Sequence, residues 1–129
     1  MTTFFCHKLA RDKIIEDCEQ QNIGIDYHIM NEGDYHKALA QKLQEESLEV
    51  VSAQKDELLE ELADVQEVLD ALLKAHGFTS EQLHQVQLEK REKKGGFDKK
   101  IYVNAITVAD DSPWKEHFLK QPDKYRQEK

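Results

Sequence analysis

Apolar and polar residues recur along most of this chain with the spacing of amphipathic helices. In the helix expected between residues 35 and 54, one face is marked by Leu39, Leu43, Val50 and Ala53, which recur at helical spacing. The same spacing runs from about 57 to 76. A third helix is expected from 79 to about 94, between the capping-box pattern TSEQ and a glycine pair. Because only a short turn joins the first two helices, we expect them to be antiparallel neighbours.

Three residues are placed to mark the ends of these helices. Asp34 and Asp56 precede the first and second long helices, and short acidic side chains accept hydrogen bonds from the free N–H groups of a first helical turn. Gly77 follows the second helix and can take the left-handed conformation that commonly ends one.

Shorter elements are expected outside the long helices. Residues 8–21 could form a charged helix that Asn22 and Gly24 would end. Residues 25–30 alternate apolar and polar side chains, and IYVNAITV at 101–108 is β-branched and aromatic. The predicted fold class is therefore all-α, an antiparallel helix bundle, to which 25–30 and 101–108 could add a small two-stranded β ribbon.

Composition limits the organisation and the partners of the chain. Its 129 residues fit one domain, 1–129, and 39% apolar with 34% charged residues is typical of a globular protein with a charged surface. A net charge of −8 argues against binding to nucleic acid or to an anionic membrane. An anionic substrate would need a divalent metal or a local cluster of cations.

Cysteine usage and the N-terminus predict a cytoplasmic protein. Cys6 and Cys18 show no zinc-binding spacing, so we expect both to be reduced thiols. The N-terminus lacks the apolar core of a signal peptide, and no apolar run is long enough to span a membrane.

The two long helices direct acidic residues toward their own apolar faces. On a helical projection of about 100° per residue, Glu46 lies inside the apolar stripe of the first helix, with Glu49 at its edge. Glu61 lies inside the apolar band of the second helix, and Asp64 borders it. Such carboxylates would repel one another in a low-dielectric site, and Mg²⁺ or Mn²⁺ would relieve that repulsion. On this pattern alone, the alternative of ordinary solvated acidic faces stays open.

These acids resemble the motif of a known superfamily. EESLE at 45–49 followed by ELAD at 61–64 is similar to the EExxE…ExxD pattern of the all-α NTP pyrophosphohydrolases, which include MazG, the dimeric dUTPases and phosphoribosyl-ATP pyrophosphohydrolase. HKLARDKI at 7–14 and KREKKGGFDKKIYV at 90–103 resemble segments of a small MazG-like branch predicted to remove non-canonical nucleotides. The resemblance covers about residues 7–104 and leaves 110–129 as a tail.

The resemblance implies a Mg²⁺-dependent enzyme that splits a nucleoside triphosphate into the monophosphate and pyrophosphate. Glu46, Glu49, Glu61 and Asp64 would hold the metal. Glu45 would orient or deprotonate the attacking water, and Glu49 is a second candidate for that role. The family fold implies a helix bundle completed by a homodimer or a dimer of dimers.

Basic residues are expected to bind the substrate phosphates. Arg11 and Lys13 form one small group, and Arg91 and Lys94 belong to a larger one beside the glycine pair. Fixed cations stabilise charge on phosphoryl groups, although runs of charge are more often solvated surface.

Three other functions remain open on the sequence. The chain could hydrolyse phosphoribosyl-ATP, although ELADVQEVLDAL differs from the ADLLYH-like stretch associated with that enzyme. It could also be a non-catalytic module that binds a nucleotide through metal and regulates a partner, or a purely structural helical dimer.

Overall fold

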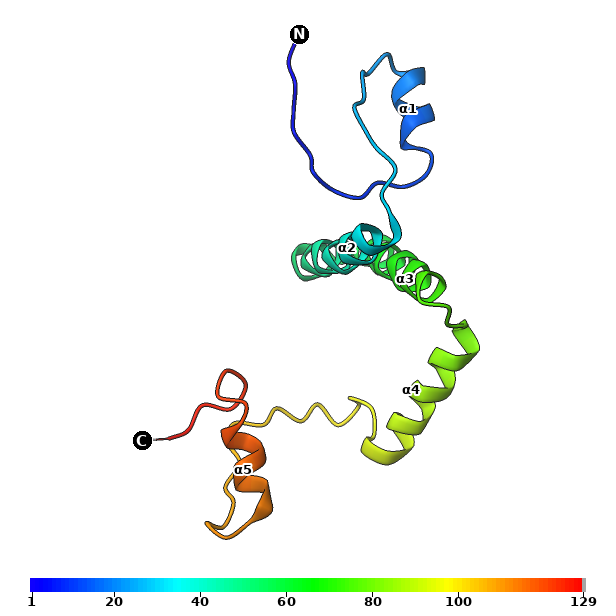
Figure 1. Cartoon of the computed structure of the whole chain (residues 1–129). Coiled ribbons are helices and arrows are strands. Elements are labelled where there is room, and N and C mark those ends of the chain that lie inside the picture. The colour runs from blue at the N-terminus through cyan, green and yellow to red at the C-terminus, as the bar shows by residue number, and fades with distance from the viewer. Residues whose placement is uncertain (129) are drawn as a thin grey trace. The chain divides into compact units, whose positions relative to one another are not determined.

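The computed structural model describes residues 1–128, which contain five helices and no strand. The helices are α1 (Ile14–Gln20), α2 (Glu32–Ser52), α3 (Leu58–Ala75), α4 (Ser80–Lys94) and α5 (Pro113–Leu119), labelled in Figure 1. The chain divides into two compact units, Met1–Glu92 and Lys93–Lys129, and each is described by itself. The all-α prediction is confirmed. The prediction of a single domain stays a prediction.

The centre of the first unit is the pair α2 and α3, which lie side by side (Figure 1). His36 in the second turn of α2 has its Nε2 3.2 Å from the carbonyl oxygen of Ala75, the last residue of α3. Its ring also packs against His76, with centroids 4.3 Å apart. The start of one helix therefore meets the end of the other, and the pair is antiparallel as predicted.

The apolar core of this pair is small. Among the described residues only Leu39 of α2 and Val68 of α3 are buried, with 2% and 7% of their surface exposed. Other leucines that the helical pattern assigned to the inner faces are more accessible, and Leu62 is 47% exposed. The single chain therefore leaves much of its apolar helical surface uncovered.

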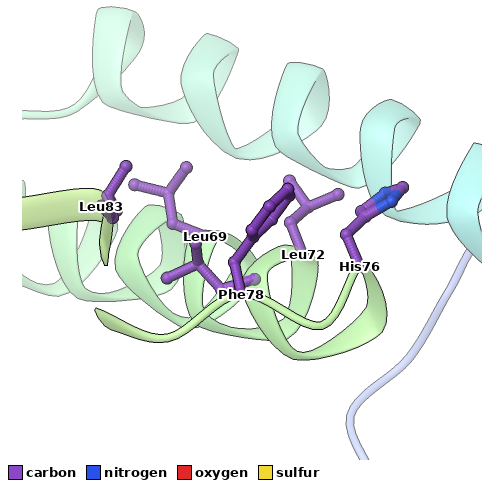
Figure 2. Close-up of a pocket in the computed structure, with 6 residues that line it drawn as sticks. Leu69, Leu72, His76, Phe78 and Leu83 are labelled. Carbon is purple, nitrogen blue, oxygen red and sulfur yellow. The ribbon is translucent and has the colours of Figure 1, made fainter. Parts of the chain in front are cut away.

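A second apolar region lies where the chain passes from α3 to α4. It is a hollow of about 220 Å³, shown in Figure 2, and its walls carry only apolar side chains and one histidine. The lining residues are Leu69, Leu72, Leu73, His76, Phe78 and Leu83.

The C-terminal ends of three helices lie where glycine and asparagine residues predicted them. Gly77 has φ +75°, its N–H bonds to the carbonyl of Lys74, and the N–H of Phe78 bonds to that of Leu73. These two hydrogen bonds together form a Schellman motif. Asn22 (φ +56°) ends α1 in the same way, and Gly95 (φ +83°) follows α4.

Thr79 and Gln82 form the predicted capping box at the start of α4. The N–H of Gln82 donates to Thr79 Oγ1 at 3.1 Å, and the N–H of Thr79 donates to Gln82 Oε1 at 2.8 Å. Two otherwise free donors are satisfied reciprocally.

The two predicted aspartate caps are wrong. The cap of α2 is Asn31, whose extended backbone (ψ 168°) lets its Oδ1 accept the N–H of Asp34 at 2.9 Å. Asp34 therefore lies inside the first turn. The cap position of α3 is Glu57 rather than Asp56, and its near-helical backbone (ψ −15°) directs no side-chain oxygen to the first turn.

Neither 25–30 nor 101–108 is a strand in the part of the chain that the structure describes. Alternation and β-branching favour extended backbone, but a strand also needs a partner for its N–H and C=O groups. Neither segment makes a backbone–backbone hydrogen bond within the part of the chain that the structure describes. The first helix is also shorter than the predicted 8–21, because 8–13 are not helical.

The second unit contains one short helix that the sequence pattern did not predict. Ser112 caps α5 by accepting the N–H of Trp114, and Pro113 occupies the first helical position, where no N–H is needed. Phe118 and Tyr125 pack edge to face with ring centroids 4.8 Å apart. None of the helices described, in either unit, is long and apolar enough to cross a membrane.

Candidate metal and phosphate site

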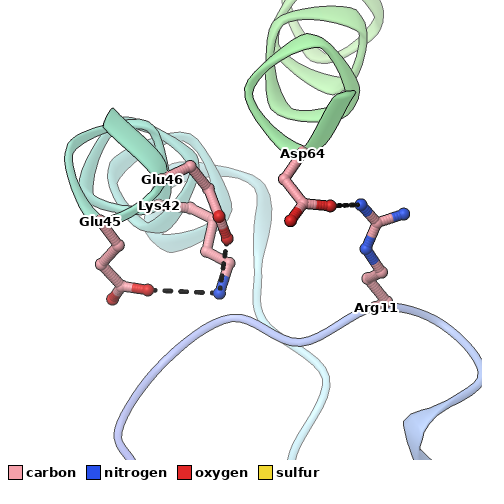
Figure 3. A network of polar contacts seen from close by, with 5 residues as sticks. All are labelled: Arg11, Lys42, Glu45, Glu46 and Asp64. Carbon is pink, nitrogen blue, oxygen red and sulfur yellow. Dashed lines mark hydrogen bonds and ion pairs between the residues drawn. The ribbon is translucent and has the colours of Figure 1, made fainter. Parts of the chain in front are cut away.

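Acidic side chains from both long helices meet in the half of the α2–α3 pair that is nearer to the turn joining them. Glu46 comes from α2, and Glu61 and Asp64 come from α3 at the i, i+3 spacing that places them on one side of a helix. One carboxylate oxygen of each lies within 4.8 Å of the others. Figure 3 shows Glu46 and Asp64 pointing to the same side of the pair, toward the N-terminal segment that carries Arg11.

Glu61 is the least satisfied of these acids. Its Oε2 is buried and has no hydrogen-bond partner among the described residues. Burial raises the pKa of Glu61 above its usual value, and a side-chain hydrogen bond and charge repulsion from Glu49 raise it further. The charges of Asp64 and Glu46 act in the same direction. A buried carboxylate oxygen without a partner is costly, so a cation at this point would be stabilising.

The three acids have the right chemistry for a hard divalent cation. Carboxylate oxygens are the ligands that Mg²⁺ and Mn²⁺ prefer. Two oxygens bound to one Mg²⁺ at about 2.1 Å can be at most about 4.2 Å apart, so oxygens within 4.8 Å need only small side-chain adjustments. The residues therefore fit such an ion.

Cations of the chain itself already contact two sides of the acidic cluster. Lys42 Nζ lies 3.2 Å from Glu45 Oε2 and 3.5 Å from Glu46 Oε1. Arg11, 53 positions before its partner, donates to Asp64 Oδ1 at 2.6 Å. Both contacts are drawn in Figure 3. The pairs partly neutralise the acids, but neither reaches the free oxygen of Glu61.

A hollow of about 370 Å³ lies beside the acids, between the N-terminal segment and the helix pair. Its walls carry three cations, three carboxylates and one apolar residue: Arg11, Lys13, Lys42, Asp17, Glu46, Asp64 and Ile14. A space with cations and carboxylates in its walls can take a metal ion together with the phosphates bound to it.

The remaining predicted site residues are placed less closely. Glu49 interacts with Glu61 but does not belong to the close group of three. Glu45 is half-exposed and paired with Lys42. Arg91 and Lys94 are exposed on α4 and make no ion pair within residues 1–128, so their phosphate role stays a prediction.

Sequence reasoning did not single out Lys42. A signal was present, because Lys42 precedes Glu45 and Glu46 by three and four positions, where helical side chains are neighbours. Only the structure adds that the same lysine lines the hollow.

Comparisons with known proteins add no family assignment. No family model matches the chain, and no curated protein or solved structure matches it either.

Proposed function

We propose that the protein is a metal-dependent nucleoside triphosphate pyrophosphohydrolase that removes non-canonical or surplus nucleotides in the cytoplasm. The observation that supports this most is the meeting of Glu46, Glu61 and Asp64 around a buried carboxylate oxygen without a partner. The adjoining hollow, with Arg11, Lys13 and Lys42 in its walls, is suited to a polyphosphate chain. The EExxE…ExxD resemblance identifies these same acids.

Each group of residues has a distinct task in this proposal. Glu46, Glu61 and Asp64, with Glu49 beside Glu61, would hold Mg²⁺ or Mn²⁺. The bound ion would neutralise phosphate oxygens and lower the pKa of a water molecule. Glu45 lies at the edge of the cluster, half-exposed, where a carboxylate can orient or accept a proton from the attacking water. Arg11 and Lys13 would hold phosphate oxygens in the hollow.

The reaction can be tested by pyrophosphate release. The purified chain is incubated with canonical and modified nucleoside and deoxynucleoside triphosphates, and with phosphoribosyl-ATP, in Mg²⁺, in Mn²⁺ and in EDTA. We expect release that needs the metal and favours one group of nucleotides. A preference for phosphoribosyl-ATP would change the substrate and keep the site. Folded, metal-bound protein that releases nothing from any substrate would refute the enzymatic proposal.

We also propose that a second copy of the chain covers the exposed apolar side of α3. Leu58, Leu62, Leu69 and Leu73 recur there at helical spacing, and Leu58 and Leu62 are 36% and 47% exposed. With only two buried apolar residues described, the chain has little core of its own. Exposed apolar patches on helices commonly mark protein–protein interfaces. Leu69 of this stripe also lines the apolar hollow between α3 and α4, together with Phe78 (Figure 2).

The association can be tested by light scattering coupled to size-exclusion chromatography. We expect a dimer or a dimer of dimers for the wild type, and a smaller species for Leu62→Asp, which would place a charge in the interface. Glu60→Lys, an exposed neighbour on the same helix, should leave the assembly unchanged. A wild type that is monomeric at all concentrations would refute this part of the proposal.

A further inference from the structure

The side chain of Lys42 on α2 is largely enclosed. Its side chain is only 19% exposed, and that of Glu46, one of its two partners, is 12% exposed. A lysine charge in such a position is costly unless it is paired, so its contacts with Glu45 and Glu46 stabilise it. Lys42 also lines the hollow that Arg11 and Lys13 share, which gives its ammonium group a second place to bind an anion.

The position of Lys42 conflicts with metal binding by Glu46. In the structure the Nζ of Lys42 lies 3.5 Å from Glu46 Oε1, and Glu46 belongs to the three acids that can surround one cation. A divalent ion held by Glu46 would take over this carboxylate and would repel the ammonium group. The lysine would then need another anionic partner close by, and the phosphates of a bound substrate would supply one.

We propose that Lys42 is a further phosphate-binding residue of this site. In the metal-free protein its ammonium group pairs with Glu45 and Glu46. When metal and substrate bind, the ammonium group moves to a phosphate oxygen. This inference rests on the proposed function. Without phosphate, Lys42 competes with the metal for Glu46. With phosphate present, Lys42 binds the metal–phosphate complex. Metal and polyphosphate therefore bind with positive coupling.

The inference predicts opposite changes in two affinities when the charge is removed. In Lys42→Gln, Mn²⁺ alone should bind more tightly than in the wild type, by roughly three- to tenfold, because the competing charge is gone. The preformed Mn²⁺–tripolyphosphate complex should bind more weakly, by about tenfold, because a charge-assisted contact is lost. Lys42→Arg keeps the charge and should restore most of the binding of the complex.

Both affinities can be measured on the full chain without any turnover. Electron paramagnetic resonance counts free Mn²⁺ for the first, and titration calorimetry measures the Mn²⁺–tripolyphosphate complex for the second. Lys37→Gln is the matched control, because Lys37 is exposed on α2 and makes no ion pair among the described residues. This control should leave both affinities unchanged.

Three outcomes would overturn the inference. If Lys42→Gln weakens both affinities, the lysine only supports the structure. If it changes neither, Lys42 is a bystander. In either case, nucleotide hydrolysis by the wild type would leave the proposed function standing while the inference fails. A wild type that binds neither Mn²⁺ nor its tripolyphosphate complex would refute both.

Discussion

The α2–α3 pair contains two regions that satisfy their buried groups very differently. Where α2 begins and α3 ends, Leu39 is almost fully buried and His36 finds the carbonyl of Ala75. Nearer to the turn that joins the two helices, Glu61 in the first turn of α3 has a buried oxygen with no partner, beside acids that repel it. One region is packed for stability, whereas the other carries a cost that a bound cation would relieve at neutral pH. Such local violations are typical of functional sites.

The comparison predicts that the acidic region can be damaged without harm to the fold. Asp64→Ala should lower kcat/KM for pyrophosphate release by at least roughly 100-fold, the loss seen when a preorganised charge is removed from a reacting site. Helicity measured by circular dichroism should remain nearly unchanged. Glu67→Gln, an exposed acid on the same helix, is the control and should retain full activity. Substantial metal-dependent activity in Asp64→Ala would remove the acid from the site.

The packed region should respond in the reverse way. Leu39→Ala should lower the free energy of unfolding by about 2–5 kcal/mol, because it leaves a cavity at one of the two buried apolar positions. Val86→Ala on α4, which is half-exposed, should cost less than about 1 kcal/mol. Urea unfolding followed by circular dichroism measures both. Equal effects would mean that the α2–α3 pair has no distinct core.

The pH dependence of stability should reveal the unfavourable environment of the Glu61 carboxylate charge. Because the folded-state pKa of Glu61 is raised, the native protein binds its proton more tightly than the unfolded chain does. The resulting stabilisation is present at acidic pH and is lost as pH rises from the unfolded-state pKa through the folded-state pKa. Metal-free Glu61→Gln should lack this loss and melt at a higher temperature than the wild type at neutral pH.

Two controls sharpen this prediction. Glu60→Gln, on the exposed side of α3, should keep the wild-type pH profile in thermal melts with EDTA. Added Mg²⁺ should raise the melting temperature of the wild type at neutral pH, because a ligand that binds only the native state stabilises it. Glu61→Gln should gain less from Mg²⁺. An identical gain in both proteins would place the metal elsewhere.

The smallest effect is expected at the ion pair between Arg11 and Asp64. Its distance is short, 2.6 Å, but both side chains are accessible, and exposed pairs contribute at most about 1 kcal/mol. Arg11→Gln should therefore change the free energy of unfolding by less than that, while raising KM for the nucleotide. Lys8→Gln, an exposed neighbour, serves as the control for both measurements. An unchanged KM would assign Arg11 a role in the metal-free state only.

The sequence by itself determined the three longer helices and the arrangement of acids along the first two. The capping box of Thr79 and Gln82, the left-handed Gly77 and the i, i+3 pair Glu61 and Asp64 all depend on residues within one or two turns. Because these interactions join residues that are close in the sequence, the spacing of residue types predicts them. The predicted caps Asp34 and Asp56 are wrong, because backbone conformation decides which residue is the cap. Asn31 is extended and caps α2, and Glu57 occupies the cap position of α3.

Only the tertiary structure decided which groups are satisfied. The free oxygen of Glu61, the reach of Arg11 across 53 positions to Asp64, and the shared place of Lys42 in the hollow each need two segments brought together. Residues 25–30 and 101–108 are not strands in the structure, because local propensity alone does not supply the partner that a strand needs. Local spacing sets which side chains share a helix face, and packing sets what that face meets.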